Sequence, residues 1–294
     1  MPLPTRHPQP DGRRRLLRSA GAAALAWAAA GLAGCDQARN LKLRLQGMRV
    51  IEERDTQFGR LAVVELDRKR YLAYGPGTEF VFQSVLDLDR PLALAAPYTQ
   101  LMMLGAVYVP RLGRLAQIGA GAGNMAGYAI RTFPGAEVDA VDIDRHAVEL
   151  GARHFGLTPN PRLHVHIEDG RRWLAAATTP FDVVMLDAYD DQSIPPALMD
   201  ASFFALVAER LAPGGVVMQN VYLPIVDTAR LLAAMRSAFP EIDVYRVGNS
   251  AVLAAHRGPA RDPAQLLARA RELDAALAPV HPLADSLAHR VTGL

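Results

Sequence analysis

Three groups of residues in this sequence have the types and the spacing that a nucleoside site needs. A glycine-rich turn, 119–124 (Gly-Ala-Gly-Ala-Gly-Asn), directly follows a short apolar run. The next apolar run ends in Asp142, 23 positions after Gly119, and a third run is followed by Asp169. Glycines let the backbone approach a ligand closely, and an acid at about this spacing can accept hydrogen bonds from ribose hydroxyls. The pattern predicts that Gly119, Gly121 and Asp142 bind a nucleoside, with Asp169 placed to accept from an adenine amino group.

Two features keep other interpretations of these residues open. Asn124 occupies the position where a phosphate-binding turn carries its third glycine, so the turn does not specifically call for a pyrophosphate. Asp142 and Asp169 both stand where a strand gives way to a helix, and an acid there often caps the helix instead. A structural role is the alternative for each acid.

A cluster of acids follows a fourth apolar run. Asp187 ends the run 183–186 (Val-Val-Met-Leu), and Asp190 and Asp191 lie in the same loop. Carboxylates at such a strand end can hold a cationic amine and accept its proton, which an alkylamine must lose before it attacks the carbon beside a sulfonium. We expect Asp187 to act on the amine. For Asp190 and Asp191 the alternative is a solvated turn.

The periodicity of the chain indicates the elements that position these residues. From Val50 to Leu86, short alternating runs predict antiparallel hairpins. From Arg114 onward, strand-like runs alternate with helical stretches, which is typical of a parallel sheet with crossover helices. The candidate strands are 115–118, 138–142, 163–167, 181–187, 215–220, 242–247 and 251–256.

The last two candidate strands are separated only by Gly248-Asn249-Ser250, so they must form a hairpin. Five parallel strands followed by a hairpin are the order expected of an S-adenosylmethionine-methyltransferase sheet. The predicted fold class is α/β, a Rossmann-like sheet of that type with a small N-terminal antiparallel β domain. We expect these domains at 44–96 and 97–260. The segment 261–294 is expected to hold an amphipathic helix, 262–277, and a weakly ordered tail.

Residues 1–35 have the layout of a secretory leader. A basic segment, 13–18, precedes an uncharged, Ala-rich run that is shorter than the roughly 20 residues needed to cross a membrane. Leu32-Ala33-Gly34-Cys35 is similar to a bacterial lipobox, and segment 13–18 resembles a twin-arginine export motif. We expect a diacylated Cys35 to anchor an exported protein on the periplasmic side of the membrane. The alternatives are a chance cysteine in an Ala-rich helix and a cytoplasmic protein whose leader is not used.

Composition excludes several classes of protein. Half of the 294 residues are hydrophobic, and the single cysteine excludes a disulfide framework and a cysteine-rich zinc site. The formal charge is +2, but the first 18 residues contribute +4, so the remainder predicts no nucleic-acid partner. His164 and His166 lie two apart on a candidate strand without an obvious third ligand, so no metal is expected. The chain contains no G-x-S-x-G and no P-loop motif.

With these residues in place, the sequence resembles the spermidine synthase family, the polyamine aminopropyltransferases, from about Gln57 to His256. The residues that carry the resemblance are Gln57, Phe82-Gln83-Ser84, Tyr98, Asp142-Ile143-Asp144, Glu168-Asp169-Gly170, Asp187 with Asp190, and Pro213-Gly214-Gly215 followed by Gln219.

The resemblance implies roles for two sets of residues. One set would meet a small-molecule amine and carry the chemistry: Tyr98, Asp187 and Asp190. The other would bind the co-substrate, decarboxylated S-adenosylmethionine or S-adenosylmethionine: Gln57, Gly119, Gly121, Asp142 and Asp169.

Three positions depart from the family pattern. Ala122 stands where family synthases carry the acid that binds the amine of the aminopropyl donor. Tyr98-Thr99-Gln100 replaces the usual Tyr-His-Glu, and Ala188-Tyr189 replaces two small hydroxyl residues. Our leading hypothesis is a transferase that moves an aminopropyl group to an amine. The alternatives are a methyltransferase on the same fold and a non-catalytic, membrane-tethered protein that binds a nucleoside or polyamine. A homodimer is compatible with each.

Overall fold

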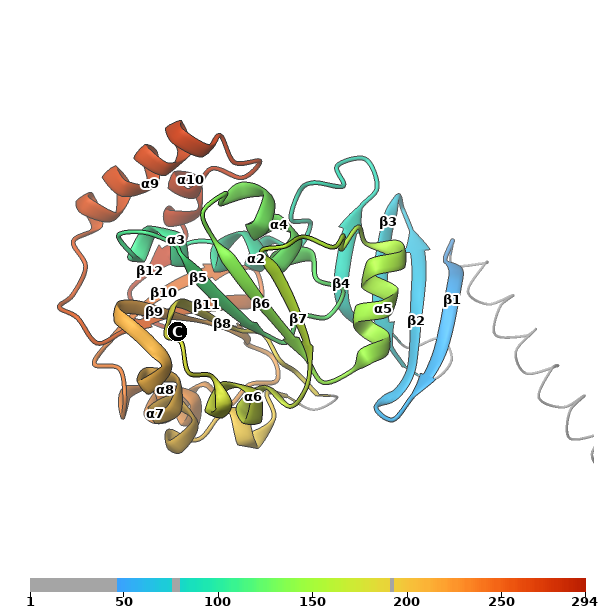
Figure 1. Ribbon diagram of the computed structural model, residues 1–294, viewed down its shortest axis with the longest axis horizontal. Coiled ribbons are helices and arrows are strands. Elements are labelled where there is room, and N and C mark those ends of the chain that lie inside the picture. Colours follow the sequence, from blue (N-terminus) through green and yellow to red (C-terminus); the bar gives the residue numbers. More distant parts are fainter. Residues whose placement is uncertain (1–46, 76–79, 191–192) are drawn as a thin grey trace, which may run out of the picture. The chain divides into compact units, whose positions relative to one another are not determined.

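The computed structural model describes residues 47–75, 80–190 and 193–294. They form a small N-terminal sheet and a larger sheet with helices on both faces (Figure 1). The predicted leader with Cys35, and Asp191, lie outside the described residues, so their roles stay predictions. Within the described ranges, no helix combines the length and the apolar character that a membrane span requires.

The small sheet is built from alternating strands that pair in chain order. It comprises β1 (Arg49–Thr56), β2 (Gly59–Leu66), β3 (Lys69–Tyr74) and β4 (Val81–Asp87). β2 pairs antiparallel with β3, and β3 pairs antiparallel with β4. The N-terminal antiparallel sheet predicted from the alternating runs is therefore confirmed.

The large sheet has the order β12-β10-β11-β9-β8-β5-β6-β7. Its parallel part consists of β5 (Arg114–Ile118), β6 (Glu137–Asp142), β7 (Leu163–Ile167), β8 (Phe181–Leu186) and β9 (Leu211–Tyr222). An antiparallel hairpin, β10 (Glu241–Val247) with β11 (Ser250–His256), joins at β9. This arrangement confirms the predicted α/β fold class.

Alternate residues of the parallel strands enter two separate cores, because successive side chains of a strand point to opposite faces. The first core lies against α2 (Pro97–Met102), α3 (Gly105–Tyr108), α4 (Asn124–Thr132) and α9 (Pro263–Leu277). The second lies against α6 (Gly170–Ala176), α7 (Ala201–Arg210) and α8 (Thr228–Arg236), which Figure 1 shows on the other side of the sheet. A short 3₁₀ helix, η1 (Pro196–Leu198), precedes α7. Both faces of the inner parallel strands β5, β6, β8 and β9 are thus covered, as such sheets require, whereas the edge strand β7 is partly exposed.

The expectation of a weakly ordered tail is wrong. After α9 the chain forms α10 (Leu283–Leu287) and a short strand, β12 (Arg290–Val291), which pairs with β10. The carboxylate of Asp274, within α9, accepts hydrogen bonds from the first two N–H groups of α10 at 2.7 and 3.0 Å. Arg290 forms an ion pair with Asp243 of β10. These long-range polar contacts, together with the packing of Leu283 and Leu287 on the first core, hold the segment in place.

Candidate active site

Most of the predicted site residues lie at the edge of the large sheet where its parallel strands end. The peptide N–H of Asp187, after β8, donates to the carbonyl of Ile118 at the end of β5 (2.8 Å). The N–H of Gly119 donates to the carbonyl of Val141 in β6 (2.9 Å). The glycine turn after β5 therefore lies between the strand that ends in Asp142 and the strand that leads to Asp187. Ligands of open α/β sheets bind at this edge.

The glycine turn needs its glycines for two physical reasons. Gly119, Gly121 and Gly123 have φ values of 87°, 53° and 77°, which residues with side chains rarely adopt. A Cβ atom on Gly119 would also lie 2.6 Å from the carbonyl carbon and oxygen of Asp187. The turn thus packs directly on the backbone of the acidic loop.

Asp142 fixes the shape of this turn. Its Oδ2 accepts a hydrogen bond from the N–H of Gly121 (2.6 Å), and its Oδ1 accepts one from the N–H of Asp144 (2.9 Å). Burial raises the pKa of Asp142, and these backbone hydrogen bonds oppose the rise. Since each carboxylate oxygen has a second lone pair, Asp142 can still accept from a ribose placed over the turn.

The small N-terminal sheet supports the turn from one side. Ser84 of β4 accepts a hydrogen bond through Oγ from the N–H of Ala122 (3.1 Å). The hydroxyl of Tyr74, in β3, donates to the buried carboxylate of Asp144. Asp144 also caps α5 (Arg145–His154) by accepting from the N–H of His146 (2.9 Å). Ser84 belongs to the predicted family segment, whereas nothing in the sequence pattern pointed to Tyr74.

Asp187 is the most perturbed carboxyl at this edge. Its Oδ2 accepts from the hydroxyl of Tyr98 (3.1 Å) and its Oδ1 accepts from the side-chain amide of Asn220 (2.7 Å). Burial raises the pKa of Asp187 to about 7, against the lowering effect of these two hydrogen bonds. Burial and the neighbouring carboxylate raise the pKa of Tyr98 well above its usual range, so its hydroxyl stays a donor. A carboxyl that titrates near neutrality is suited to take up a proton from a substrate.

Asp190 lies in a tight turn beyond Asp187. Its Oδ1 accepts from the N–H of Ser193 (2.8 Å), and its own N–H donates to the Ser193 carbonyl (2.9 Å). The side chain of Asp190 is exposed, so it is placed to contribute charge at the rim rather than a buried base. Tyr189 turns away into the second core, where its hydroxyl donates to the Asn220 carbonyl (3.1 Å).

Two other predicted site residues occupy peripheral positions. Asp169 caps α6 by accepting from the N–H of Arg172 (2.8 Å), which is the structural alternative raised from the sequence, and its side chain is exposed. Gln57 lies exposed in the turn between β1 and β2. Among the described residues, no hydrogen bond joins Gln57 to the glycine turn.

Ala122 is fully buried in a cluster formed by the small sheet and α5. Its neighbours in this cluster include Leu61, Val63 and Phe155. This apolar environment suits a methyl group and does not suit a carboxylate. Alanine in place of the family's acid at position 122 is therefore consistent with the apolar residues around it.

Sequence reasoning missed two polar residues at the same edge, Gln117 and Asn220. Both are almost fully buried, with 1% and 5% of their surface exposed. The available signal was an amide side chain inside an otherwise apolar strand, because long polar side chains are seldom fully buried. The amide of Gln117 donates to the carbonyl of Gly119 (3.0 Å), so it too contacts the glycine turn.

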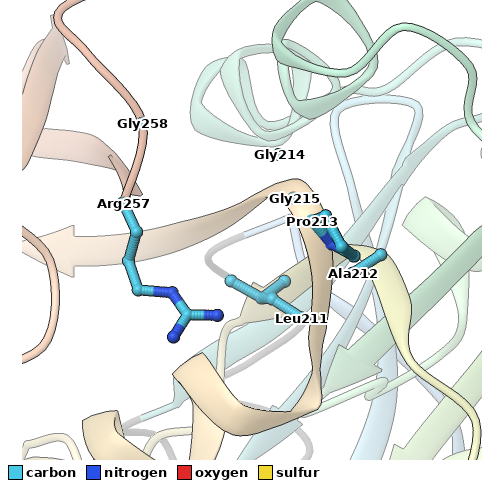
Figure 2. Close-up of a pocket in the computed structure, with 7 residues that line it drawn as sticks. All are labelled: Leu211, Ala212, Pro213, Gly214, Gly215, Arg257 and Gly258. Atoms are coloured by element: carbon cyan, nitrogen blue, oxygen red, sulfur yellow. The ribbon is translucent and has the colours of Figure 1, made fainter.

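Other features of the surface lie apart from this edge. A pocket lies at the start of β9, and Asn220 lies near the other end of that strand. Figure 2 shows the residues that line the pocket: Leu211, Ala212, Pro213, Gly214, Gly215, Arg257 and Gly258. His166 contacts the buried Asp139 (2.8 Å), which also binds Arg114 (2.7 Å). Within the described ranges, no group of three His, Cys, Asp or Glu side chains could hold a metal.

Asp142→Ala should weaken nucleoside binding by about 1.5 to 3 kcal/mol, the range for hydrogen bonds to a charged group. Calorimetric titration with methylthioadenosine measures the effect. Asp182→Ala is the matched control, because Asp182 also accepts two backbone hydrogen bonds (2.7 and 2.8 Å) but lies at the start of β8, away from the site. Equal affinities for the two variants would remove Asp142 from the ligand site.

Comparison with known proteins identifies similar chains. Residues 99–247 match the family model described as the spermine/spermidine synthase domain. A probable polyamine aminopropyl transferase of Bifidobacterium longum is 36% identical over 104 residues, which are 35% of this chain and 23% of that protein. The chain therefore spans less than a quarter of the length of that curated relative.

Two solved structures extend the comparison. Human methyltransferase-like protein 13, in complex with SAH, has a TM-score of 0.57 and 27% identity, over 63% of this chain and 93% of that chain. Spermidine synthase from Thermotoga maritima has a TM-score of 0.63 over 81% of this chain and 84% of that chain. At 16% identity the second match shows a common fold.

Proposed function

Because this chain belongs to the spermine/spermidine synthase family, we propose that it transfers an aminopropyl group from an adenosyl sulfonium donor to an amine acceptor. The observation that carries this proposal is the position of Asp187. It lies beside a glycine turn suited to a nucleoside, and its pKa of about 7 matches the work of a proton acceptor.

The proposed reaction assigns Asp187 two successive roles. An alkylamine, with a pKa of about 10, arrives as a cation, and the carboxylate stabilises it. Asp187 then accepts one proton from the nitrogen, which frees the lone pair. That lone pair forms the new C–N bond while the C–S bond breaks and its electron pair stays on sulfur. The products are the aminopropylated amine and methylthioadenosine, and the proton leaves through Asp187.

The donor would lie along the glycine turn. In this arrangement Asp142 accepts from the ribose hydroxyls, and Asp169 lies beyond it at the start of α6, where its free oxygen can meet the adenine. Tyr98 and Asn220 act as positioning residues, because each donates to one oxygen of Asp187 and so directs the remaining lone pairs toward the amine.

A second candidate function is methyl transfer from S-adenosylmethionine on the same fold. The observation that favours it is the buried Ala122, which leaves the position of the donor-selecting acid without a charge. The similarity to human methyltransferase-like protein 13 supports it as well. A chain that binds the nucleoside without turnover is the third candidate.

One incubation separates these candidates. Purified protein is mixed with a set of alkylamines and either decarboxylated S-adenosylmethionine or S-adenosylmethionine, and the products are analysed by mass spectrometry. Aminopropyl transfer releases methylthioadenosine from the decarboxylated donor. Release of S-adenosylhomocysteine from the carboxylated donor would establish the methyltransferase instead, and binding without either product would leave the non-catalytic candidate.

A further inference from the structure

The C-terminal segment, 278–291, contacts the stretch of chain that leads into α2, the helix that carries Tyr98. His281 lies between α9 and α10, and its Nε2 accepts a hydrogen bond from the peptide N–H of Leu94 (2.9 Å). Leu94 is buried in the first core, three residues before α2 begins at Pro97. A residue near the far end of the chain therefore holds the entry to this helix.

The carbonyl of the same residue is bound by α2 itself. Gln100, within α2, donates through its side-chain amide to the Leu94 carbonyl (2.9 Å). An ionised glutamate, which the family pattern would place at this position, has no hydrogen to donate and would repel that carbonyl. Leu94 is thus bound through its N–H by the C-terminal segment and through its carbonyl by α2.

The helix α2 depends on such contacts for its position. It has six residues, fewer than two turns, and the alanine that precedes it, Ala96, has no polar side chain to cap its first N–H groups. A helix this short gains little stability from its own hydrogen bonds. Tyr98 is its second residue and donates to Asp187 (3.1 Å), so a shift at the start of α2 would displace this hydrogen bond directly.

His281 is itself held in place from two directions. Its N–H donates to the hydroxyl of Tyr128 in α4 (3.3 Å), and the centroids of the two rings lie 6.0 Å apart. The chain just after it is tied to α9 through Asp274, which binds the first N–H groups of α10. Burial and the nearby Arg90 lower the pKa of His281, so at neutral pH its Nε2 is unprotonated and can accept.

We propose that His281 and Gln100, joined through the backbone of Leu94, form a latch by which the C-terminal segment positions α2 and the Tyr98 hydroxyl that it carries. Both are positioning residues, because they act through Tyr98 and not on a substrate. The assignment rests on the proposed function in one respect, since it is the reaction at Asp187 that gives the hydrogen bond from Tyr98 its importance. The latch itself can be measured without turnover.

Hydrogen–deuterium exchange of the purified protein measures the latch directly. His281→Leu removes the acceptor at a similar side-chain size, and we expect exchange of residues 93–102 to accelerate about two- to tenfold, the scale of one hydrogen bond. Gln100→Glu breaks the latch from the other side and should have the same effect. His281→Gln should restore the wild-type exchange, because its amide oxygen lies as many bonds beyond Cγ as Nε2 of histidine.

The pH dependence of turnover tests whether the latch acts on Asp187. Turnover should fall at low pH, because a protonated Asp187 cannot accept a proton. Burial raises the pKa of Asp187 and the hydrogen bond from Tyr98 lowers it, so loss of that bond should move the fall in rate to higher pH. We expect this shift in His281→Leu and in Gln100→Glu, with kcat about two- to tenfold lower and the KM for the donor nearly unchanged. Tyr98→Phe, which removes the hydroxyl itself, should shift the fall in the same direction.

His289→Leu is the matched control. His289 belongs to the same C-terminal segment and lines the same pocket as His281 and Gln100, but its Nδ1 contacts the carbonyl of Arg246 in β10 (3.2 Å). This variant should keep the wild-type exchange of residues 93–102 and the wild-type pH dependence. An equal effect of His289→Leu and His281→Leu would show that the segment acts only as general support, and would overturn the latch.

The outcomes separate the latch from the proposed function. Wild-type exchange of residues 93–102 in His281→Leu, or faster exchange with an unshifted pH dependence, would overturn the latch even if aminopropyl transfer is observed. If the wild type forms no product, NMR titration of the Asp187 carboxyl replaces the rate, and a shift of that titration in His281→Leu would support the latch while the activity is rejected. Should His281→Leu not fold, Gln100→Glu carries the same expectations.

Discussion

Asp187→Asn should lower turnover by about 10²-fold or more, the usual scale for a positioned acid or base, and leave donor affinity nearly unchanged. Asparagine keeps the size of the side chain but cannot accept the proton that the amine must lose. The wild-type rate should also fall as the pH drops through about 7, because a protonated Asp187 no longer accepts a proton. The residual activity of the Asp187→Asn variant should not show this fall in rate at low pH.

Steady-state kinetics over donor concentration, amine concentration and pH measure these effects. Asp190→Asn is the companion variant. The carboxyl of Asp190 lies in the same loop but is exposed, so it is not placed to act as a buried base. This variant should raise the KM for the amine more than it lowers kcat. Near-normal turnover of Asp187→Asn with an amine that the wild type uses would exclude the proposed mechanism.

Gly119→Ala should destabilise the protein by about 2 to 5 kcal/mol, combining backbone strain at positive φ with overpacking. The new Cβ would lie 2.6 Å from the backbone of Asp187, so either the glycine turn or the acidic loop must move. Nucleoside binding and turnover should be lost together, because the same contact joins both halves of the site.

Urea unfolding gives the stability change, and Gly156→Ala separates its two causes. Gly156 has a similar φ of 75°, but a Cβ there would meet nothing within 4 Å. Its substitution should cost only the backbone strain, about 1 to 2 kcal/mol. Equal losses for the two variants would show that the close approach of Gly119 to Asp187 does not constrain the site.

The inner parallel strands β5, β6, β8 and β9 were predictable from sequence because both their faces are buried, which produces largely apolar runs of the right length. β7 was predicted at its observed bounds, and β9 extends beyond the prediction at both ends. The positions of the glycine turn, Asp142 and Asp187 at the strand ends were also predictable, since each lies at the end of such a run, whereas their roles stay predictions. The tail was not predictable, because its order depends on contacts with Asp274, Asp243 and the first core, which cannot be predicted from the tail's few apolar residues alone.

The raised pKa of Asp187 could not be predicted from the sequence for a related reason. Its position at a strand end indicates a functional acid, but its pKa is raised by burial and lowered by hydrogen bonds from Tyr98 and Asn220, and these surroundings come from distant parts of the chain. Asp169 illustrates the opposite limit, because the same local pattern fits a ligand acid and a helix cap. In the structure its Oδ1 caps α6.

The burial that raises the pKa of Asp187 also determines when this acid becomes reactive as the chain folds. Asn220 follows it by 33 residues, and the two meet only when β9 pairs with β8 beyond the intervening α7. A growing or partly folded polypeptide that lacks this last parallel pairing carries an ordinary solvated carboxylate at position 187. Because such non-local pairing forms slowly, the group gains its reactivity late in folding, and a chain cut short before β9 never acquires it.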